Sequence, residues 1–162
     1  MSSTDNPGSR ESTGSAELEM LTESECWDLV RGADIGRLAW TQASGHPVVV
    51  PVNFIVDDGD VVFRSAEGEK FAAVLADHLL AFQVDDAEPA VRVGWSVLIQ
   101  GRGSAVTDQA EVERLCQSLR PWSEGRRHVV RLHPERISGR RLSEHPGRVT
   151  TLWIGPTSHE GA

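Results

Sequence analysis

Several segments of the chain have the residue pattern of short strands separated by turns. Runs rich in Val, Ile, Leu and Phe are separated by turn-forming residues, and Asp58-Gly59 is the strongest hairpin signal. In the longest run, 91–106, the glycines Gly94, Gly101 and Gly103 favour bending around a barrel. The pattern predicts strands at 35–41, 46–56, 61–63, 79–84, 91–106, 128–132 and 135–142. We expect Trp40 and Trp95 on exposed faces of these strands.

Three segments have helical spacing instead. Thr22 begins a capping-box pattern, which opens a helix that Gly32 can end. A second helix is predicted over 67–76, and a third runs from the cap Asp108 to Pro121. Together the elements predict a mainly β fold, a barrel of six or seven mostly antiparallel strands with two or three short helices at its sides.

The elements fall into one domain. Residues 1–19 are polar and contain Pro and Gly, so we expect a disordered tail. The domain is predicted over 20–154, and 155–162 is expected to be a loose C-terminal tail. With 162 residues, a single domain can bury a core without disulfides or metals.

Charge and cysteine content limit the possible partners. The net charge of −8 is not offset by a stripe of basic residues, which argues against a nucleic-acid or membrane partner. Cys26 and Cys116 have no neighbours at metal-ligand spacing and are expected to be free thiols in predicted helices. With no apolar run long enough for a membrane span and no signal peptide pattern, we expect a cytoplasmic protein.

One cluster of residues suggests an anion site. Lys70 is the only lysine among 16 Lys and Arg residues, and it follows Arg64 and Ser65 just beyond the predicted hairpin. A guanidinium fork, a hydroxyl and a compact ammonium are a good donor set for a phosphate group. The alternative is that Lys70 is a solvated side chain at the start of a helix.

The order of these features resembles the pyridoxamine 5′-phosphate oxidase-like family of flavin-binding split barrels, of the type frequent in actinobacteria. The similarity covers about residues 20–142 and rests on Pro51-Val52-Asn53-Phe54, the Asp-Gly hairpin, Phe63-Arg64-Ser65, Lys70 and the long glycine-rich strand. The resemblance implies a split β-barrel fold and a homodimer with two FMN sites at its interface.

The resemblance also implies roles for individual residues. Residues matching Arg64, Ser65 and Lys70 hold the FMN phosphate, and the strand Val50, Pro51, Val52, Asn53 runs along the flavin ring. Ser96 matches a polar contact near the ring, and Trp95 is its neighbour. For Pro51 and Asn53 the alternative is a β-bulge without a ligand.

Departures from the oxidase pattern argue against vitamin B6 oxidation. Ser138 stands where the oxidases are expected to have a tryptophan, and the family's Arg-x-His pattern is missing from 136–142. We therefore expect a flavin-dependent oxidoreductase acting on an aromatic or quinone-like acceptor, with no acid or base that the sequence names. The alternatives are a deazaflavin-dependent reductase and a non-catalytic carrier of flavin or haem.

The remaining candidates are weaker. His46 is expected to be exposed, and Trp122 either covers a flavin from the partner subunit or packs on the barrel. The spacing of His128 and His133 does not suit one metal ion. We find no Ser-His-Asp order, Walker loop or GxGxxG motif, so the sequence does not support a hydrolase, an NTPase or a Rossmann enzyme.

Overall fold

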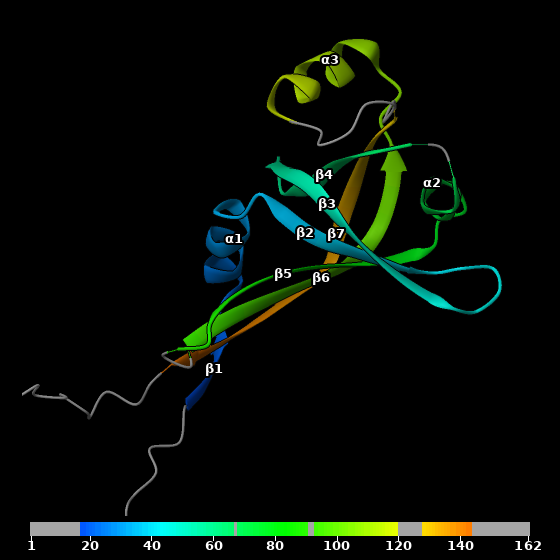
Figure 1. Cartoon of the computed structure of the whole chain (residues 1–162). Coiled ribbons are helices and arrows are strands. Elements are labelled where there is room, and N and C mark those ends of the chain that lie inside the picture. The colour runs from blue at the N-terminus through cyan, green and yellow to red at the C-terminus, as the bar shows by residue number, and fades with distance from the viewer. Residues whose placement is uncertain (1–16, 67, 91–92, 120–127, 144–162) are drawn as a thin grey trace, which may run out of the picture.

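The computed structural model describes residues 17–66, 68–90, 93–119 and 128–143, without the side chains of residues 17, 69, 70, 75 and 143. The described part contains seven strands and three helices (Figure 1). In chain order they are β1 Glu17–Leu21, α1 Glu23–Arg31, β2 Ile35–Thr41, β3 Pro47–Asp57, β4 Asp60–Ser65, α2 Glu69–Leu75, β5 Leu79–Glu88, β6 Val93–Ala105, α3 Gln109–Ser118 and β7 His128–Ser143.

The strands form one antiparallel sheet that closes into a barrel. Its order is β1-β7-β4-β3-β2-β5-β6, and a further pairing of β7 with β6 joins the two sides. Six strands therefore make the closed barrel, while β1 adds to the outside of β7. This arrangement confirms the predicted split-barrel fold. Closure of the antiparallel sheet removes free strand edges.

Strand β7 is one element, although the sequence predicted two strands separated by Pro134. Its first half pairs with β4, and its second half pairs with β1. Along its length β7 also pairs with β6, where the register shifts between Gln100 and Gly101 opposite Pro134. A bulge accommodates the proline, which lacks a backbone N–H, so the strand continues past it.

The core is built from the inward-facing residue of each strand. Phe63, Phe82, Leu38 and Ile99 are fully buried, and the rings of Phe54 and Phe82 meet edge to face with centroids 4.8 Å apart. Burying each such side chain stabilises the fold by roughly 1.5–3 kcal/mol. The barrel interior is therefore a packed core.

The helices cover different parts of this barrel (Figure 1). Helix α1 buries Cys26 and Val30 in the main core, and α2 contributes Ala73 and Val74 to the same core. Helix α3 lies apart and packs Leu115 with a second cluster on the outer side of β4 and β7.

Local signals in the sequence located the turns and caps. The Thr22 side chain accepts from the backbone N–H of Glu25 and completes the capping box, while Gly32 caps the end of α1. The hairpin between β3 and β4 has positive φ angles at Asp58 (51°) and Gly59 (81°), the conformation that an Asp-Gly turn favours.

Two expectations differ from the structure. The predicted start of the domain, residue 20, lies within β1, because Glu17–Leu21 pairs with β7. Trp40 was expected on an exposed strand face, together with Trp95, but it is only 7% exposed and lies in the core. Trp40 points inward because side chains alternate along β2 and it lies on the same side as the buried Leu38.

Replacing Gly101 by alanine should lower the free energy of unfolding by about 2–3 kcal/mol. A Cβ atom at Gly101 would stand 1.9 Å from the backbone oxygen of His133, so the β6–β7 bulge would have to shift. Urea unfolding measures the change. Gly32→Ala is the control, because its Cβ would meet nothing closer than 3.5 Å at an ordinary φ of −81°. Equal effects of the two substitutions would contradict this account.

Candidate functional site

Two of the predicted ligand residues lie side by side on the outside of the barrel. Phe54 and Phe63 pair across β3 and β4, and both point into the core. Asn53 and Arg64 are the next residues on each strand, so both side chains point outward from adjacent strands. Both are half-buried. An amide and a guanidinium at this position offer donors for an anion or a ring carbonyl.

The predicted ring-contacting stretch of β3 divides between the two sides of the strand. Val52 is buried, and Val50 packs partly against the core. Pro51 is exposed on the outside, like its neighbour Asn53. A flat group lying on β3 would therefore meet Pro51, Asn53 and the strand backbone, while the two valines support the strand from inside.

The loop after β4 carries the other predicted phosphate ligands. Ser65 is fully buried, and its hydroxyl donates to the backbone oxygen of Ala66 at 2.8 Å. Lys70 lies in the first turn of α2, but its side chain is outside the described residues. Gly68 has a φ of 139°, which strongly favours glycine. The phosphate-binding roles of Ser65 and Lys70 stay predictions.

Ser96 and Trp95 point to opposite sides of β6. Trp95 lies on the side of the buried Val97 and packs partly against the core. Ser96 is half-buried on the outer side, where it pairs with Asp85 and Arg140. Strands β2 and β5 separate it from Asn53, a distance of about 14 Å at the usual strand spacing.

Large hydrophobic side chains are exposed between polar ones on the outside of the barrel. Leu18 pairs with Leu142 on β7, whereas Met20 pairs with Arg140 and Leu98 pairs with Gln83. Seven large hydrophobic side chains on this face, from 37% to 68% exposed, come from six strands. We call this surface the outer face, and its apolar members are Leu18, Met20, Ile35, Val49, Leu79, Leu98 and Leu142.

A polar cluster lies within the outer face. Arg37 forms an ion pair with Asp85 and donates to Gln83 at 3.4 Å, while Gln83 donates to Asp85 at 3.0 Å. Arg37 and Gln83 are cross-strand partners, and Gln83 also pairs with Leu98. The cluster is thus bordered by the apolar side chains of the outer face.

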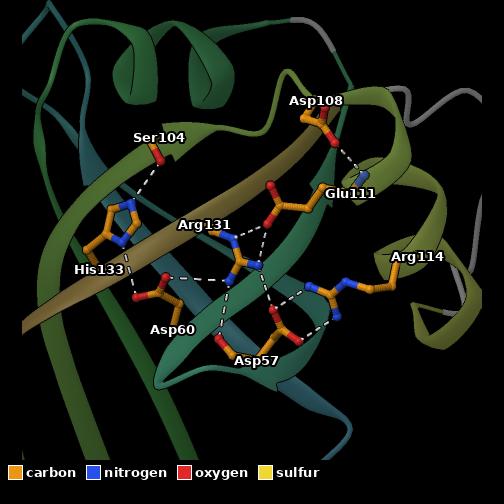
Figure 2. Close-up of polar contacts among 8 residues, drawn as sticks. All are labelled: Asp57, Asp60, Ser104, Asp108, Glu111, Arg114, Arg131 and His133. Carbon is orange, nitrogen blue, oxygen red and sulfur yellow. Dashed lines mark hydrogen bonds and ion pairs between the residues drawn. The ribbon is translucent and has the colours of Figure 1, made fainter.

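On another part of the barrel surface, Arg131 joins α3 to the β3–β4 hairpin (Figure 2). Its guanidinium donates to Glu111 Oε1 at 2.6 Å, Asp57 Oδ2 at 2.5 Å and Asp60 Oδ2 at 3.5 Å. The Arg131 side chain is 13% exposed. Arg114 adds a bidentate pair to Asp57, with both contacts at 2.9 Å.

These contacts favour the ionised form of the Asp57 carboxyl. Hydrogen bonds from Arg114 and then from Arg131 hold the pKa of the Asp57 carboxyl far below its usual value. The buried guanidinium is therefore matched by several negative charges, which offsets much of its desolvation.

A serine, a histidine and an aspartate also meet beside this network (Figure 2). Ser104 Oγ lies 2.8 Å from His133 Nε2, and His133 Nδ1 lies 3.1 Å from Asp60 Oδ1. No such order is visible along the chain, because the three residues come from β6, β7 and β4. Only the strand pairing brings them together, so no linear pattern could have located them.

Two hollows open on the surface. One of about 420 Å³ lies between α1, β3 and α3, with Val30, Phe54 and Leu115 beside Arg31 and Arg114. Another of about 320 Å³ lies at the far end of β5 and β6 and is the place where Trp95 is accessible, with Asp86, Arg141 and Leu142.

Other predicted features can be placed directly. His46 is exposed as expected, Ser138 lies on the outer side of β7, and Trp122 is outside the described residues. Cys26 and Cys116 are free, and burial raises the pKa of the Cys26 thiol, which disfavours its reactive thiolate.

Two absences hold for the described residues. They contain no group of three or more His, Cys, Asp or Glu side chains arranged to hold a metal ion. Within the same residues, no helix combines the length and apolar character needed to cross a membrane.

Comparison with known proteins gives consistent matches. The family model described as pyridoxamine 5′-phosphate oxidase matches residues 22–141. The uncharacterised protein Rv0080 of Mycobacterium tuberculosis is 33% identical over 144 residues, which cover 84% of this chain and 94% of that protein.

Two solved structures have a fold similar to that of this chain. The FAD-binding protein from Mycobacterium smegmatis superimposes with a TM-score of 0.62 at 33% identity, covering 76% of this chain and 97% of its own. An FAD-binding protein from Mesorhizobium loti gives a TM-score of 0.68 at 25% identity, covering 80% of this chain and 100% of its own.

Replacing Arg131 by methionine should lower the free energy of unfolding by about 2–4 kcal/mol, because sheltered carboxylates lose their shared cation. Methionine keeps much of the apolar stem, so the change isolates the charge. Arg114→Met is the control: it contacts the same Asp57 but is 57% exposed, and it should cost less than about 1 kcal/mol. Chemical denaturation measures both. If both substitutions lowered the free energy of unfolding by the same small amount, the burial of Arg131 would not contribute to stability.

Proposed function

This chain belongs to the pyridoxamine 5′-phosphate oxidase family, and we propose that it is a flavin-binding oxidoreductase. The observation that carries the proposal is the outward pair of Asn53 and Arg64 on adjacent strands, next to the exposed Pro51. These residues are among those that the resemblance assigned to the cofactor, and the fold brings them to one surface.

The donor set fits a flavin phosphate and ring. Arg64 supplies a fork of N–H donors, and Lys70 follows in the first turn of α2 as a second cation. Asn53 would donate to a ring carbonyl, while Pro51 and the apolar Ile35, the cross-strand partner of Asn53, would contact a flat ring. Ser65, turned inward, shapes the loop that carries these groups.

The proposal includes a homodimer that buries the outer face. Seven large hydrophobic side chains from six strands are exposed on this face, and association would remove them from water. A second copy is its proposed occupant, because the face carries both signs of charge in the Arg37–Asp85 cluster. In a symmetric dimer this cluster can lie beside the two-fold axis, so that Arg37 of one protomer faces Asp85 of the other.

The proposed dimer also explains how Ser96 could contact the flavin ring. About 14 Å separates Ser96 from Asn53 within one chain, so the two cannot both contact one ring edge there. Both lie on the outer face, so association of two copies can bring Ser96 of one protomer to the ring held by the other. The proposed flavin sites are therefore shared between protomers.

FMN is the proposed cofactor, because Arg64 and Asn53 are neighbours and FMN has its phosphate close to its ring. FAD is the second candidate. It is favoured by two similar solved proteins that are named as FAD-binding, from M. smegmatis and M. loti. Both cofactors share the ring and the first phosphate, so the same residues would serve either one.

When bound, a flavin supplies hydride transfer through its ring. The protein's own residues would orient the ring on β3 and stabilise charge on it through Asn53 and Arg64. We assign no acid or base, and we do not extend the proposal to vitamin B6 oxidation because Ser138 replaces the expected tryptophan. An aromatic or quinone-like acceptor in the cytoplasm remains the proposed substrate class and location.

The purified protein should show the visible absorption of a flavin, or bind FMN or FAD on titration. Replacing Lys70 or Arg64 by alanine should weaken binding by about 1.5–3 kcal/mol, roughly ten- to hundredfold, because each removes a charged hydrogen bond. Arg31→Ala is the control, since Arg31 loses the same charge but pairs with Asp28 on its own helix.

A protein that binds neither flavin nor a deazaflavin would contradict the proposal, and a haem spectrum would favour the carrier alternative. Turnover is tested anaerobically with NADPH or reduced deazaflavin against quinones and nitroaromatics. Stoichiometric flavin binding without turnover in this panel would reject the proposed oxidoreductase activity and leave a flavin carrier.

Leu98→Glu should convert a dimer into a monomer, because it places a charge within the outer face, where Leu98 is 37% exposed. Light scattering after size exclusion measures the mass against the chain mass of 17.7 kDa. Gln117→Glu, which adds the same charge on the exposed surface of α3, should leave the dimer intact. A wild-type protein of monomer mass at micromolar concentration would rule out the shared site.

A further inference from the structure

Ser104, His133 and Asp60 form a continuous hydrogen-bonded chain on the barrel surface (Figure 2). His133 is the cross-strand partner of Arg102, and Ser104 is the partner of Arg131, so Ser104 and His133 project from adjacent strands on one side. Asp60 begins β4, which pairs with β7 from the other side. The imidazole thus lies between a hydroxyl and a carboxylate, each on its own strand.

The carboxylate determines which nitrogen of His133 carries the proton. An ionised Asp60 only accepts hydrogen bonds, so the contact of 3.1 Å requires the proton on His133 Nδ1. In neutral imidazole Nε2 then holds the lone pair and accepts from the Ser104 hydroxyl at 2.8 Å. This is the tautomer that a general base needs.

The Ser104 end of this hydrogen-bonded chain is at the surface of the protein. Asp60 is only 19% exposed and lies 3.5 Å from the guanidinium of Arg131, which holds it in place. His133 is 51% exposed, and Ser104 is exposed as well. The Asp60 carboxylate, which orients the imidazole, is sheltered, while the Ser104 hydroxyl is accessible to a reagent. A nucleophile, a base and a group that orients the base are arranged in this way in catalytic triads.

We propose that Ser104 is a base-activated nucleophile, a second reactive site that accepts acyl or phosphonyl groups from small activated esters. Ser104 Oγ forms a bond to the carbonyl carbon or phosphorus as its proton passes to His133 Nε2. The bond to the leaving group breaks, and His133 returns the proton to the leaving oxygen. Water then releases an acyl group: its oxygen bonds to the acyl carbon as its proton passes to His133 Nε2, the bond to Ser104 Oγ breaks, and His133 returns the proton to Ser104 Oγ.

The surroundings define the reagent class. Ser104 pairs with Arg131 in the β6–β7 ladder, and neither hollow described above includes Ser104. The site therefore supplies a nucleophile and a base but little stabilisation of an oxyanion, so reactive esters with good leaving groups are required. Asp60 and Arg64 stand four residues apart on β4, about 13 Å, which separates this site from the proposed flavin site.

The chain contains an internal control for this assignment. Ser44 Oγ lies 3.1 Å from His46 Nδ1, and both residues are exposed. No contact of the described residues places a carboxylate on the other nitrogen of His46. Ser44 therefore has an imidazole neighbour but no orienting group.

The test is labelling of the full chain with a fluorophosphonate, in which the Ser104 Oγ–P bond forms and fluoride leaves. Intact mass should show one added phosphonyl group, and peptide mapping should place it on Ser104 and not on Ser44. His133→Asn should slow labelling about a hundredfold, the lower end of general-base contributions. Ser104→Ala should abolish it, with thermal melts confirming that both surface variants fold.

Three outcomes would overturn the proposal: no label on the folded protein, equal labelling of Ser104 and Ser44, or an unchanged rate in His133→Asn. Because the probe reports on Ser104 whether or not flavin is bound, failure here leaves the flavin proposal untouched. The release step is tested separately with p-nitrophenyl acetate. Loss of the acetylated Ser104 mass over time supports turnover, whereas a permanent adduct would reject the release step alone.

Discussion

Closure of the barrel through β7 is the constraint on which the rest of the structure depends. This 16-residue strand bonds to β4, β6 and β1, so it satisfies strand edges that would otherwise be open. The bulge opposite Pro134 keeps both halves of β7 in one ladder with β6. The positions of all outward-facing side chains follow from this closure, because each strand has only one register that keeps its apolar residues inside.

Because side chains alternate along each strand, the residues that could bind a ligand face outward and the residues that stabilise the core face inward. On β3 the buried Val52 and Phe54 hold the strand against the core, while Pro51 and Asn53 face out. The same rule separates Trp95 from Ser96 on β6. Neighbouring residues in one motif therefore serve different purposes, and a ligand that lies on the sheet meets alternate positions rather than a continuous run.

Charge is organised locally rather than as a general field. The chain carries a net charge of −8, yet its arginines are placed where they meet particular carboxylates. Arg131 ties α3 to the β3–β4 hairpin, and Arg37 pairs with Asp85 within the outer face. The first contact connects elements of one chain. The second lies on a surface whose apolar surroundings suit a second copy. Arg131 donates through all three nitrogens of its guanidinium, a geometry that a lysine could not reproduce.

Much of the local structure was determined by the sequence alone. The capping box at Thr22, the Asp58-Gly59 turn and the strand periods all depend on residues close in the chain, and the motif from Pro51 to Lys70 indicated the family. Tertiary structure decided the rest. It joined the two predicted closing strands into β7, placed Trp40 inside, turned Ser65 inward and assembled Ser104, His133 and Asp60 from three strands. Each of these outcomes depends on the register between strands that are distant in sequence, and no local pattern encodes that register because a shift of one residue exchanges the inner and outer sides of a strand.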